Sequence, residues 1–93
     1  MRTDLSTADP HDQHALLTAF LTERTAAVLR RNTTAIDPDT PLTDLGLDSL
    51  MAVELRAHLN RATGLQIPTK AIWQHPTITA LADHLTHLLE DLT

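Results

Sequence analysis

Residues 41–55, PLTDLGLDSLMAVEL, mark the point at which a loop gives way to a helix. The first half of this stretch holds a proline and a glycine, both of which interrupt helices. Asp48 is a favoured N-cap residue, and the residues after it are mostly strong helix formers. With Gly64 as a C-terminal stop, the pattern predicts a helix over residues 49–62.

A longer helix is predicted upstream of this stretch. Asp9 and Pro10 suit an N-cap and a first helical position, and the apolar spacing extends the helix to Arg31. The apolar residues that lie roughly on one face of it are Leu16, Leu17, Phe20, Leu21, Ala27 and Val28. The residues before it show no periodicity, so residues 1–8 are expected to form a flexible leader. Residues 9–93 are then one domain.

Two further helices are predicted downstream. A short one is expected over residues 69–74, and a longer one follows Pro76 and Thr77. The longer one has a clear apolar face, made of Ile78, Leu81, Ala82, Leu85, Leu88 and Leu89. Leu and Ala dominate the apolar residues, and two glycines are too few for a sheet of hairpins. The predicted fold is therefore all-α, a small four-helix bundle with three main helices and one short helix.

The segment between the first two helices is a long loop, residues 32–47, with an unusual apolar content. Its apolar side chains are Ile36, Leu42, Leu45 and Leu47. A solvated linker would not need them, so the loop is expected to fold back over the core. Trp73 in the short helix is expected to fill the core, and a contact with a substrate is the alternative that stays open.

Composition excludes several classes of function. The formal net charge of −5 and the aromatic content of 2% argue against nucleic-acid binding. The absence of cysteine excludes thiolate chemistry, and no apolar run approaches the length of a membrane span. No signal peptide is recognised at the start of the chain, so a cytoplasmic protein is expected.

Catalytic and metal sites find little support. The histidine pairs His11/His14 and His84/His87 each lack a clear third ligand, and no Gly-x-Ser-x-Gly turn surrounds a serine. No catalytic residue and no metal site are predicted, and the chain is expected not to be an enzyme.

Ser49 is the strongest candidate for a functional residue. A helix start presents free backbone N–H groups and a partial positive charge, which favour a phosphate there by roughly 0.3–1 kcal/mol. Gly46 can adopt the left-handed conformation that a sharp turn requires, leaving Ser49 at an accessible corner. A serine that merely follows a cap and has no function is the plain alternative.

The helix after Ser49 has two apolar faces. Ala52, Leu55, Leu59 and Ala62 cluster on one side and are the expected core face. Leu50, Val53 and Ala57 lie on the other, interleaved with Glu54, while Met51 is intermediate. The second face suggests a docking surface, unless the preceding loop or the short helix covers it. Asp37, Asp39, Asp44 and Asp48 make the approach to it acidic, which would attract basic partner surfaces.

These residues resemble a known family. The stretch Pro41–Leu55 is similar to the attachment-site signature of acyl carrier proteins, particularly those of modular polyketide synthases. The stretch Ile72–Thr77, followed by Leu81 and Ala82, is similar to the junction between the third and fourth helices of that family.

The resemblance implies a non-catalytic carrier. Ser49 would receive a 4′-phosphopantetheine arm from coenzyme A through a phosphopantetheinyl transferase, with Asp48 contributing to recognition. The arm would hold acyl intermediates as thioesters for ketosynthase, acyltransferase and tailoring domains. The partner surface implied by the resemblance consists of Leu47, Leu50, Met51, Val53, Glu54 and Ala57.

Two alternatives stay open from the sequence. One is a peptidyl or aryl carrier with the same arm and another cargo, although Gly-Leu-Asp-Ser differs from the motif common in peptidyl carriers. The other is an unmodified helical module that docks through Leu50, Val53 and Ala57. A mobile carrier is expected to be monomeric in isolation.

Overall fold

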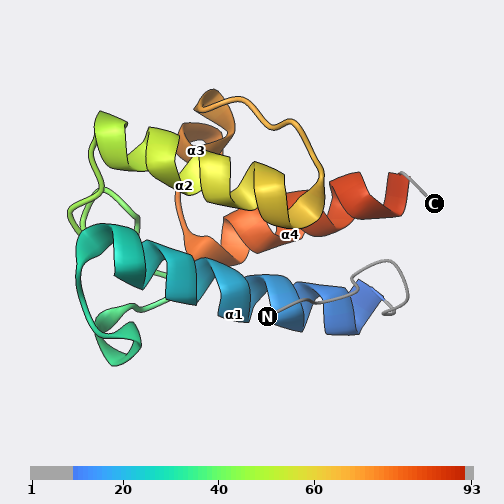
Figure 1. The fold of residues 1–93 in the computed structure, drawn as a ribbon. Helices are drawn as coiled ribbons and strands as arrows, with labels where there is room; N and C mark the ends of the chain where they lie inside the picture. The colour runs from blue at the N-terminus through green and yellow to red at the C-terminus, as the bar shows by residue number, and fades with distance from the viewer. Residues whose placement is uncertain (1–9, 92–93) are drawn as a thin grey trace.

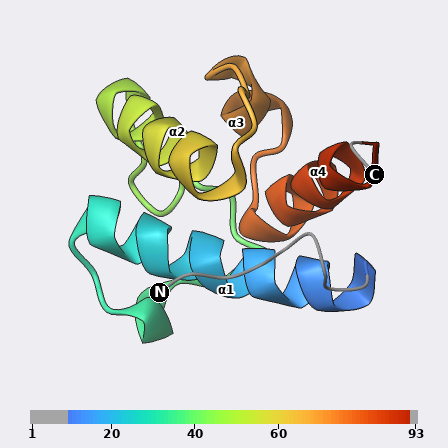
Figure 2. The same ribbon diagram turned by 45° about the vertical axis from the view of Figure 1, so that its right-hand side comes forward.

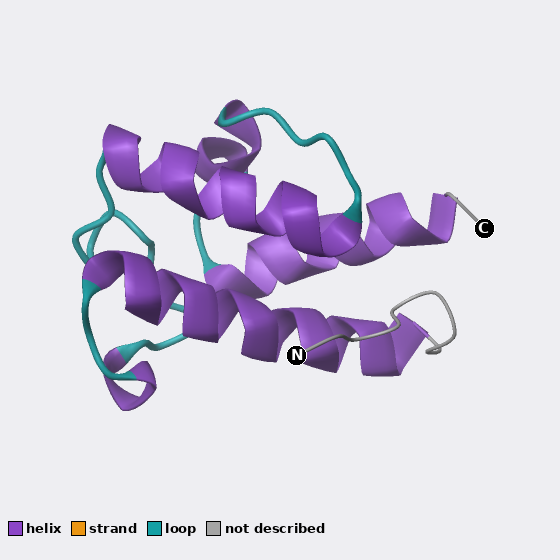
Figure 3. Ribbon diagram, viewed as in Figure 1, coloured by secondary structure: helices purple, strands orange, loops and turns teal. Residues whose placement is uncertain are grey.

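The computed structural model describes residues 10–91, with side chains from residue 12 onward. The expected leader, residues 1–8, and the expected N-cap Asp9 lie outside the described residues. Within them, the chain is helical and contains no strand (Figures 1 and 3). Its elements are α1 (Pro10–Leu29), the 3-10 turn η1 (Thr33–Ala35), α2 (Ser49–Thr63), α3 (Lys70–Gln74) and α4 (Ile78–Asp91). The predicted all-α bundle of three main helices and one short helix is confirmed.

The helices are arranged around α1, which packs against both α4 and α2. The short helix α3 lies beside α2 in both ribbon views (Figures 1 and 2). The first turn of α1 and the last turn of α4 lie at one end of the molecule, and α2 begins at the opposite end (Figures 1 and 2). No helix within residues 10–91 is both long and apolar enough to cross a membrane.

The core is built from all four α-helices and from the long loop before α2. Its largest fully buried apolar side chains are Leu17, Leu21, Leu42, Leu55, Leu59, Ile72, Ile78, Leu81 and Leu85. The predicted core face of α4 is confirmed, as is that of α2 at Ala52, Leu55 and Leu59. Burial of each such Leu or Ile contributes about 1.5–3 kcal/mol, so these contacts are the main source of stability.

Three core predictions are wrong. Ala62 is exposed because it lies in the last turn of α2, and Ala27 of α1 is exposed as well. The buried line of α1 instead ends at Thr25 and Ala26. Trp73, expected to fill the core, is 40% exposed, because Ala71 and Ile72 are the residues of α3 that face inward.

Helix α1 ends at Leu29, two residues before the predicted end at Arg31. Arg30 has a φ of 58°, in the left-handed region, and so leaves the helical path. The N–H of Arg31 then donates to the carbonyl of Ala26 at 2.9 Å, which closes the helix end. The predicted end was wrong because glycine or asparagine, the residues that usually signal this closure, is absent at position 30.

The long loop folds back over the core, as predicted. Its apolar side chains, Ile36, Leu42, Leu45 and Leu47, are all buried. Backbone hydrogen bonds join the loop to the start of α4: Leu42 N–H donates to the carbonyl of Pro76 at 2.8 Å, and Thr79 N–H donates to that of Pro38 at 3.1 Å. The loop is therefore part of the folded structure, and it positions the residues that precede α2.

Two histidine contacts tie α4 to its neighbours. The rings of His75 and His84 stack with their centroids 4.0 Å apart, which links the end of α3 to α4. Burial, followed by the proximity of His75 and His87, lowers the pKa of His84 below its ordinary value. On the other side, His14 Nε2 of α1 lies 2.7 Å from Asp83 Oδ1 of α4.

Replacing Gly46 by alanine is expected to destabilise the fold by about 1–2 kcal/mol, because Gly46 has a φ of 108°. The added Cβ would meet only ordinary contacts, the closest being Arg31 Nη2 at 3.8 Å, so the cost is one of backbone conformation. Urea denaturation measures it. Gly64→Ala, at a φ of 75° with no atom within 4 Å of the added Cβ, is the matched variant and should show a similar loss. Unchanged stability in both variants would contradict this explanation.

Candidate functional site

The site is organised by the start of α2. Asp48 is in an extended conformation, and its Oδ1 accepts a hydrogen bond from the N–H of Met51 at 2.9 Å. Its backbone carbonyl accepts from the N–H of Ala52 at 2.9 Å. Asp48 is thus the predicted N-cap, and Ser49 is the first residue of the helix.

The turn before the helix presents Ser49 to solvent. Gly46 has the left-handed conformation that was predicted for it. Leu47 points into the core with 5% of its surface exposed, and its N–H donates to the carbonyl of Leu42 at 3.0 Å. Asp48 and Ser49, which follow, are both exposed. Leu47 therefore anchors the turn, and its expected place on the partner surface is wrong because its side chain is buried.

The surroundings of Ser49 fit a covalently attached phosphate group. Its exposed position allows a large substituent without displacement of any core residue. The first turn of α2 supplies N–H groups and the positive end of the helix dipole, which favour a phosphate. The hydroxyl of Ser49 is an alcohol nucleophile on an exposed surface. Among residues 12–91, no side chain is hydrogen-bonded to the Ser49 hydroxyl.

The outer face of α2 is open to solvent. Leu50 is 70% exposed and Val53 is 44% exposed, so neither the long loop nor α3 covers them. Glu54 is exposed, whereas Met51 and Ala57 are half-buried, and Met51 packs against the core. Exposed apolar side chains beside Ser49 give the helix a surface that a partner protein could cover.

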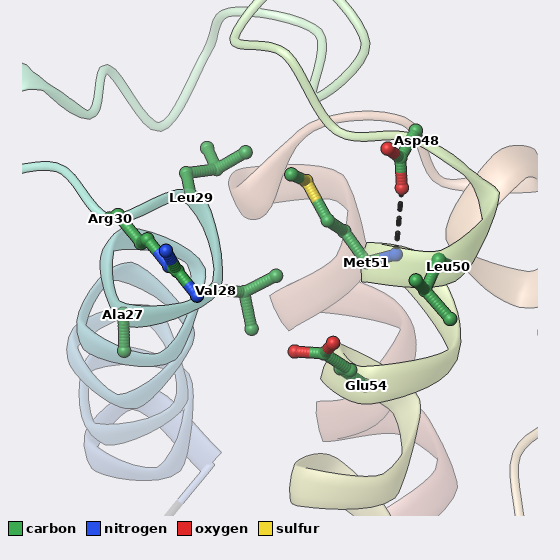
Figure 4. A pocket seen from close by; sticks show the side chains of 8 residues that line it. All are labelled: Ala27, Val28, Leu29, Arg30, Asp48, Leu50, Met51 and Glu54. Carbon is green, nitrogen blue, oxygen red and sulfur yellow. Dashed lines mark hydrogen bonds between the residues drawn. The ribbon is translucent and has the colours of Figure 1, made fainter.

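A groove runs between the end of α1 and the start of α2. Its lining consists of Ala27, Val28, Leu29, Arg30, Asp48, Leu50, Met51 and Glu54. Figure 4 shows Val28 and Met51 between the two helices, with Arg30 on the α1 side and the Glu54 carboxylate directed toward α1. The two chain neighbours of Ser49, Asp48 and Leu50, both belong to the lining.

The α1 side of this groove was missed by the sequence reasoning. The sequence pattern predicts a continuous helix through Val28 and Arg30, and it contains no signal that these residues lie opposite the start of α2. The pairing depends on where α1 ends, and position 30 carries no glycine to mark that point. Within residues 10–91, no group of three or more potential metal ligands gathers.

The decisive comparison is with protein families. A family described as "Phosphopantetheine attachment site" matches residues 19–85, which is most of the chain. The chain belongs to the phosphopantetheine attachment site family. Members of this family carry a covalently attached 4′-phosphopantetheine prosthetic group. The resemblance that the sequence suggested is thereby confirmed, and the chain is a carrier domain.

Known relatives of this carrier domain include polyketide synthases. The spectinabilin polyketide synthase system protein NorC of Streptomyces orinoci is 48% identical over 82 residues, covering 87% of this chain and 4% of the relative. Erythronolide synthase EryA3 of Saccharopolyspora erythraea is 42% identical over 78 residues, covering 83% of this chain and 2% of the relative. The chain thus corresponds to a small part of these large proteins.

Solved structures of carrier domains share the fold. An A1-type ACP domain from module 5 of MLSA1 is 38% identical, with a TM-score of 0.81 over 89% of this chain and 84% of the other. A free-standing peptidyl carrier protein from Acinetobacter baumannii is 34% identical, with a TM-score of 0.80 over 82% of this chain and 95% of the other. The bundle therefore matches both acyl and peptidyl carriers.

Proposed function

We propose that Ser49 carries the 4′-phosphopantetheine arm and that the chain delivers polyketide intermediates within a synthase. The observation that carries this proposal is the position of Ser49, an exposed serine at the capped start of α2, inside the matched family region. The other serine, Ser6, precedes the matched region, so it does not compete for the role.

The attachment reaction uses one atom of this chain. The hydroxyl oxygen of Ser49 attacks the phosphorus of coenzyme A that bears the pantetheine, and a P–O bond is formed. The P–O bond that joins this phosphorus to the rest of the coenzyme A diphosphate bridge breaks, and adenosine 3′,5′-bisphosphate leaves. The proton of the hydroxyl passes to a base of the phosphopantetheinyl transferase, which also supplies Mg²⁺. Once bound, the arm supplies a terminal thiol that holds acyl groups as thioesters.

The chain has no catalytic role in this proposal. Its residues fix the attachment point, and they present a surface to the enzymes that act on the arm. The half of α2 that contains Arg56, His58 and Arg61 is not acidic, so Asp44, Asp48 and Glu54 concentrate negative charge near Ser49. Such a charge distribution favours encounter with basic surfaces of a transferase.

The cargo is proposed to be a polyketide intermediate, since the sequence relatives at 42–48% identity are polyketide synthases. The likeness to a peptidyl carrier structure keeps the aminoacyl alternative as a second candidate. Loading assays with acyl and aminoacyl substrates separate the two, because only the matching class of loading domain should charge the arm. We further propose that the carrier is monomeric and acts in the cytoplasm, where coenzyme A is available.

The experiment that tests the proposal is a mass measurement. Incubation of the chain with coenzyme A and a broad-specificity phosphopantetheinyl transferase should add one phosphopantetheine unit. Trypsin then distinguishes the two serines, since residues 32–56 form one peptide with Ser49 while Ser6 lies in the peptide 3–24. The gain should be found in the 32–56 peptide. A folded chain that no transferase modifies would instead favour the unmodified interaction module.

Replacing Val53 by aspartate is expected to impair transfer of the cargo to partner domains by about tenfold or more in kcat/KM. Val53 lies one turn from Ser49 on the exposed face of α2, so a carboxylate there would be buried without a partner on docking. The helical signal in circular dichroism should be unchanged. Ala62→Asp, which adds the same charge at the far end of α2, is the control. Equal transfer rates in the Val53→Asp variant and the native chain would show that this face of α2 is not part of the docking surface.

A further inference from the structure

Arg30 has a backbone conformation that glycine would adopt at lower cost. Its φ of 58° is the only positive value found for a non-glycine residue among the described residues. A residue with a side chain is less stable in the left-handed conformation than in the right-handed one, because its Cβ comes too close to the carbonyl oxygen that follows. Its N–H donates to the carbonyl of Ala27 at 3.3 Å, and glycine would make the same bond. The closure of α1 therefore does not account for an arginine at this position, and its side chain is the feature that remains to be explained.

The Arg30 side chain lies on one wall of the groove beside Ser49. The opposite wall, formed by α2, carries Asp48 and Glu54 (Figure 4). Val28 and Met51 lie between the walls, both half-buried, so an apolar strip separates the cation from the carboxylates. Within residues 12–91 no ion pair or hydrogen bond joins the Arg30 guanidinium to a carboxylate. Arg30 and Glu54 thus have no ion-pair partner within this part of the chain, whereas the Asp48 carboxylate caps α2.

The charges and the apolar strip of the groove define which partner segment would fit it. A partner segment that covers the groove would place an acidic side chain opposite Arg30 and a basic one opposite Glu54. Between them, an apolar side chain would contact Val28 and Met51. Because opposite charges stand on opposite walls, a segment in the reverse orientation would meet like charges, so the groove selects one orientation. The groove is continuous with the exposed face of α2 through Leu50.

We propose that this groove docks a surface segment of the synthase catalytic domain that receives the cargo, and that Arg30 determines its orientation through an acidic residue of that domain. The inference rests on the proposed function, since the partner acts on the arm at Ser49. Arg30 is a docking residue here and takes no part in the transfer chemistry. It extends the partner surface from α2 onto the end of α1, a part of the molecule that the sequence did not indicate.

The test uses the phosphopantetheine-loaded and acylated Arg30→Gly variant with a ketosynthase–acyltransferase fragment of a modular polyketide synthase. At low ionic strength KM for the carrier should rise about fivefold with kcat unchanged, because a rim cation acts on association. The difference should shrink at high salt. At the same time the thermal midpoint should rise by about 2–5 °C, because glycine relieves the left-handed conformation. A structural role for Arg30 would not give weaker docking together with higher stability.

Two further variants make the result specific. Arg30→Lys keeps the charge and should restore most of the affinity. Arg61→Ala removes one positive charge near the C-terminal end of α2, about 18 Å along the helix from Ser49, and should leave KM unchanged. An unchanged KM for Arg30→Gly at low salt would overturn the proposal, as would an equal rise for Arg61→Ala.

Other occupants of the groove have distinct signatures. If Arg30 contacted the phosphodiester of the arm, Arg30→Gly would shift the ³¹P resonance of the isolated loaded carrier, and this outcome would overturn the proposal. If a second copy of the chain filled the groove, sedimentation equilibrium would show a dimer that Arg30→Gly dissociates, which would overturn it as well. Addition of phosphopantetheine to Arg30→Gly is followed by mass throughout. Failure of that step would concern the proposed function and not the groove.

Discussion

The Ser49→Ala variant is expected to gain no mass when it is incubated with coenzyme A and a phosphopantetheinyl transferase. The substitution removes the hydroxyl oxygen to which we propose that the phosphopantetheine is attached. It should leave the fold intact, because Ser49 is exposed and the cap of α2 is formed by the Asp48 side chain. The free energy of unfolding should therefore change by no more than about 0.5 kcal/mol. Intact-mass spectrometry of both proteins measures the difference.

Ser6→Ala is the matched control, since it removes the other serine of the chain. It should be modified to the same extent as the native protein. A Ser49→Ala protein that still gains one phosphopantetheine would contradict the assignment, and peptide mapping would then show which hydroxyl is used. Loss of modification in both variants would also argue against Ser49 as the sole determinant.

Truncation of Leu55 to alanine is expected to lower the free energy of unfolding by about 3 kcal/mol. Leu55 is completely buried in the middle of α2, with 0% of its surface exposed, and belongs to the core cluster that also includes α1 and α4 residues. Removal of its side chain forfeits buried apolar contacts and leaves a cavity. A domain of this size is stabilised by only about 5–10 kcal/mol, so the loss is a large fraction of the total. Urea denaturation followed by circular dichroism measures it.

Leu50→Ala provides the comparison for Leu55→Ala, because it makes the same chemical change on the same helix at a residue that is 70% exposed. Its unfolding free energy should change by less than about 0.5 kcal/mol. Similar losses at the two positions would mean that the assignment of the inner and outer faces of α2 is wrong.

Much of the bundle could be predicted because its helices follow local rules. The α4 pattern repeats apolar residues at helical spacing, and all of Ile78, Leu81 and Leu85 prove to be buried. The start of α2 was predictable as well, since a capping aspartate followed by helix formers is a local signal. Ser49 followed from that start, because its position at the first turn depends only on the cap.

The errors arise where a residue's environment depends on distant parts of the chain. Leu47 is an apolar residue just before α2, and Trp73 is an apolar residue within the short helix α3. The local sequence does not indicate which of the two side chains is buried. The fold buries Leu47 beneath the loop and leaves Trp73 40% exposed. The groove depends in the same way on tertiary contact, because Arg30 and Glu54 come from helices that meet only in the folded bundle.

The placement of the two ends of the bundle bears on how a carrier moves among its enzymes. The first turn of α1 and the last turn of α4 lie at one end of the molecule, while α2 begins at the other (Figures 1 and 2). A polypeptide linker that continues the chain from either of these helix ends would therefore begin at the end of the bundle remote from Ser49. Shortening or stiffening such a linker would restrict how far the domain travels, yet it would not obstruct the outer face of α2, which we propose meets an enzyme. Reach and recognition are thus separate variables in this molecule, and each can be altered without changing the other.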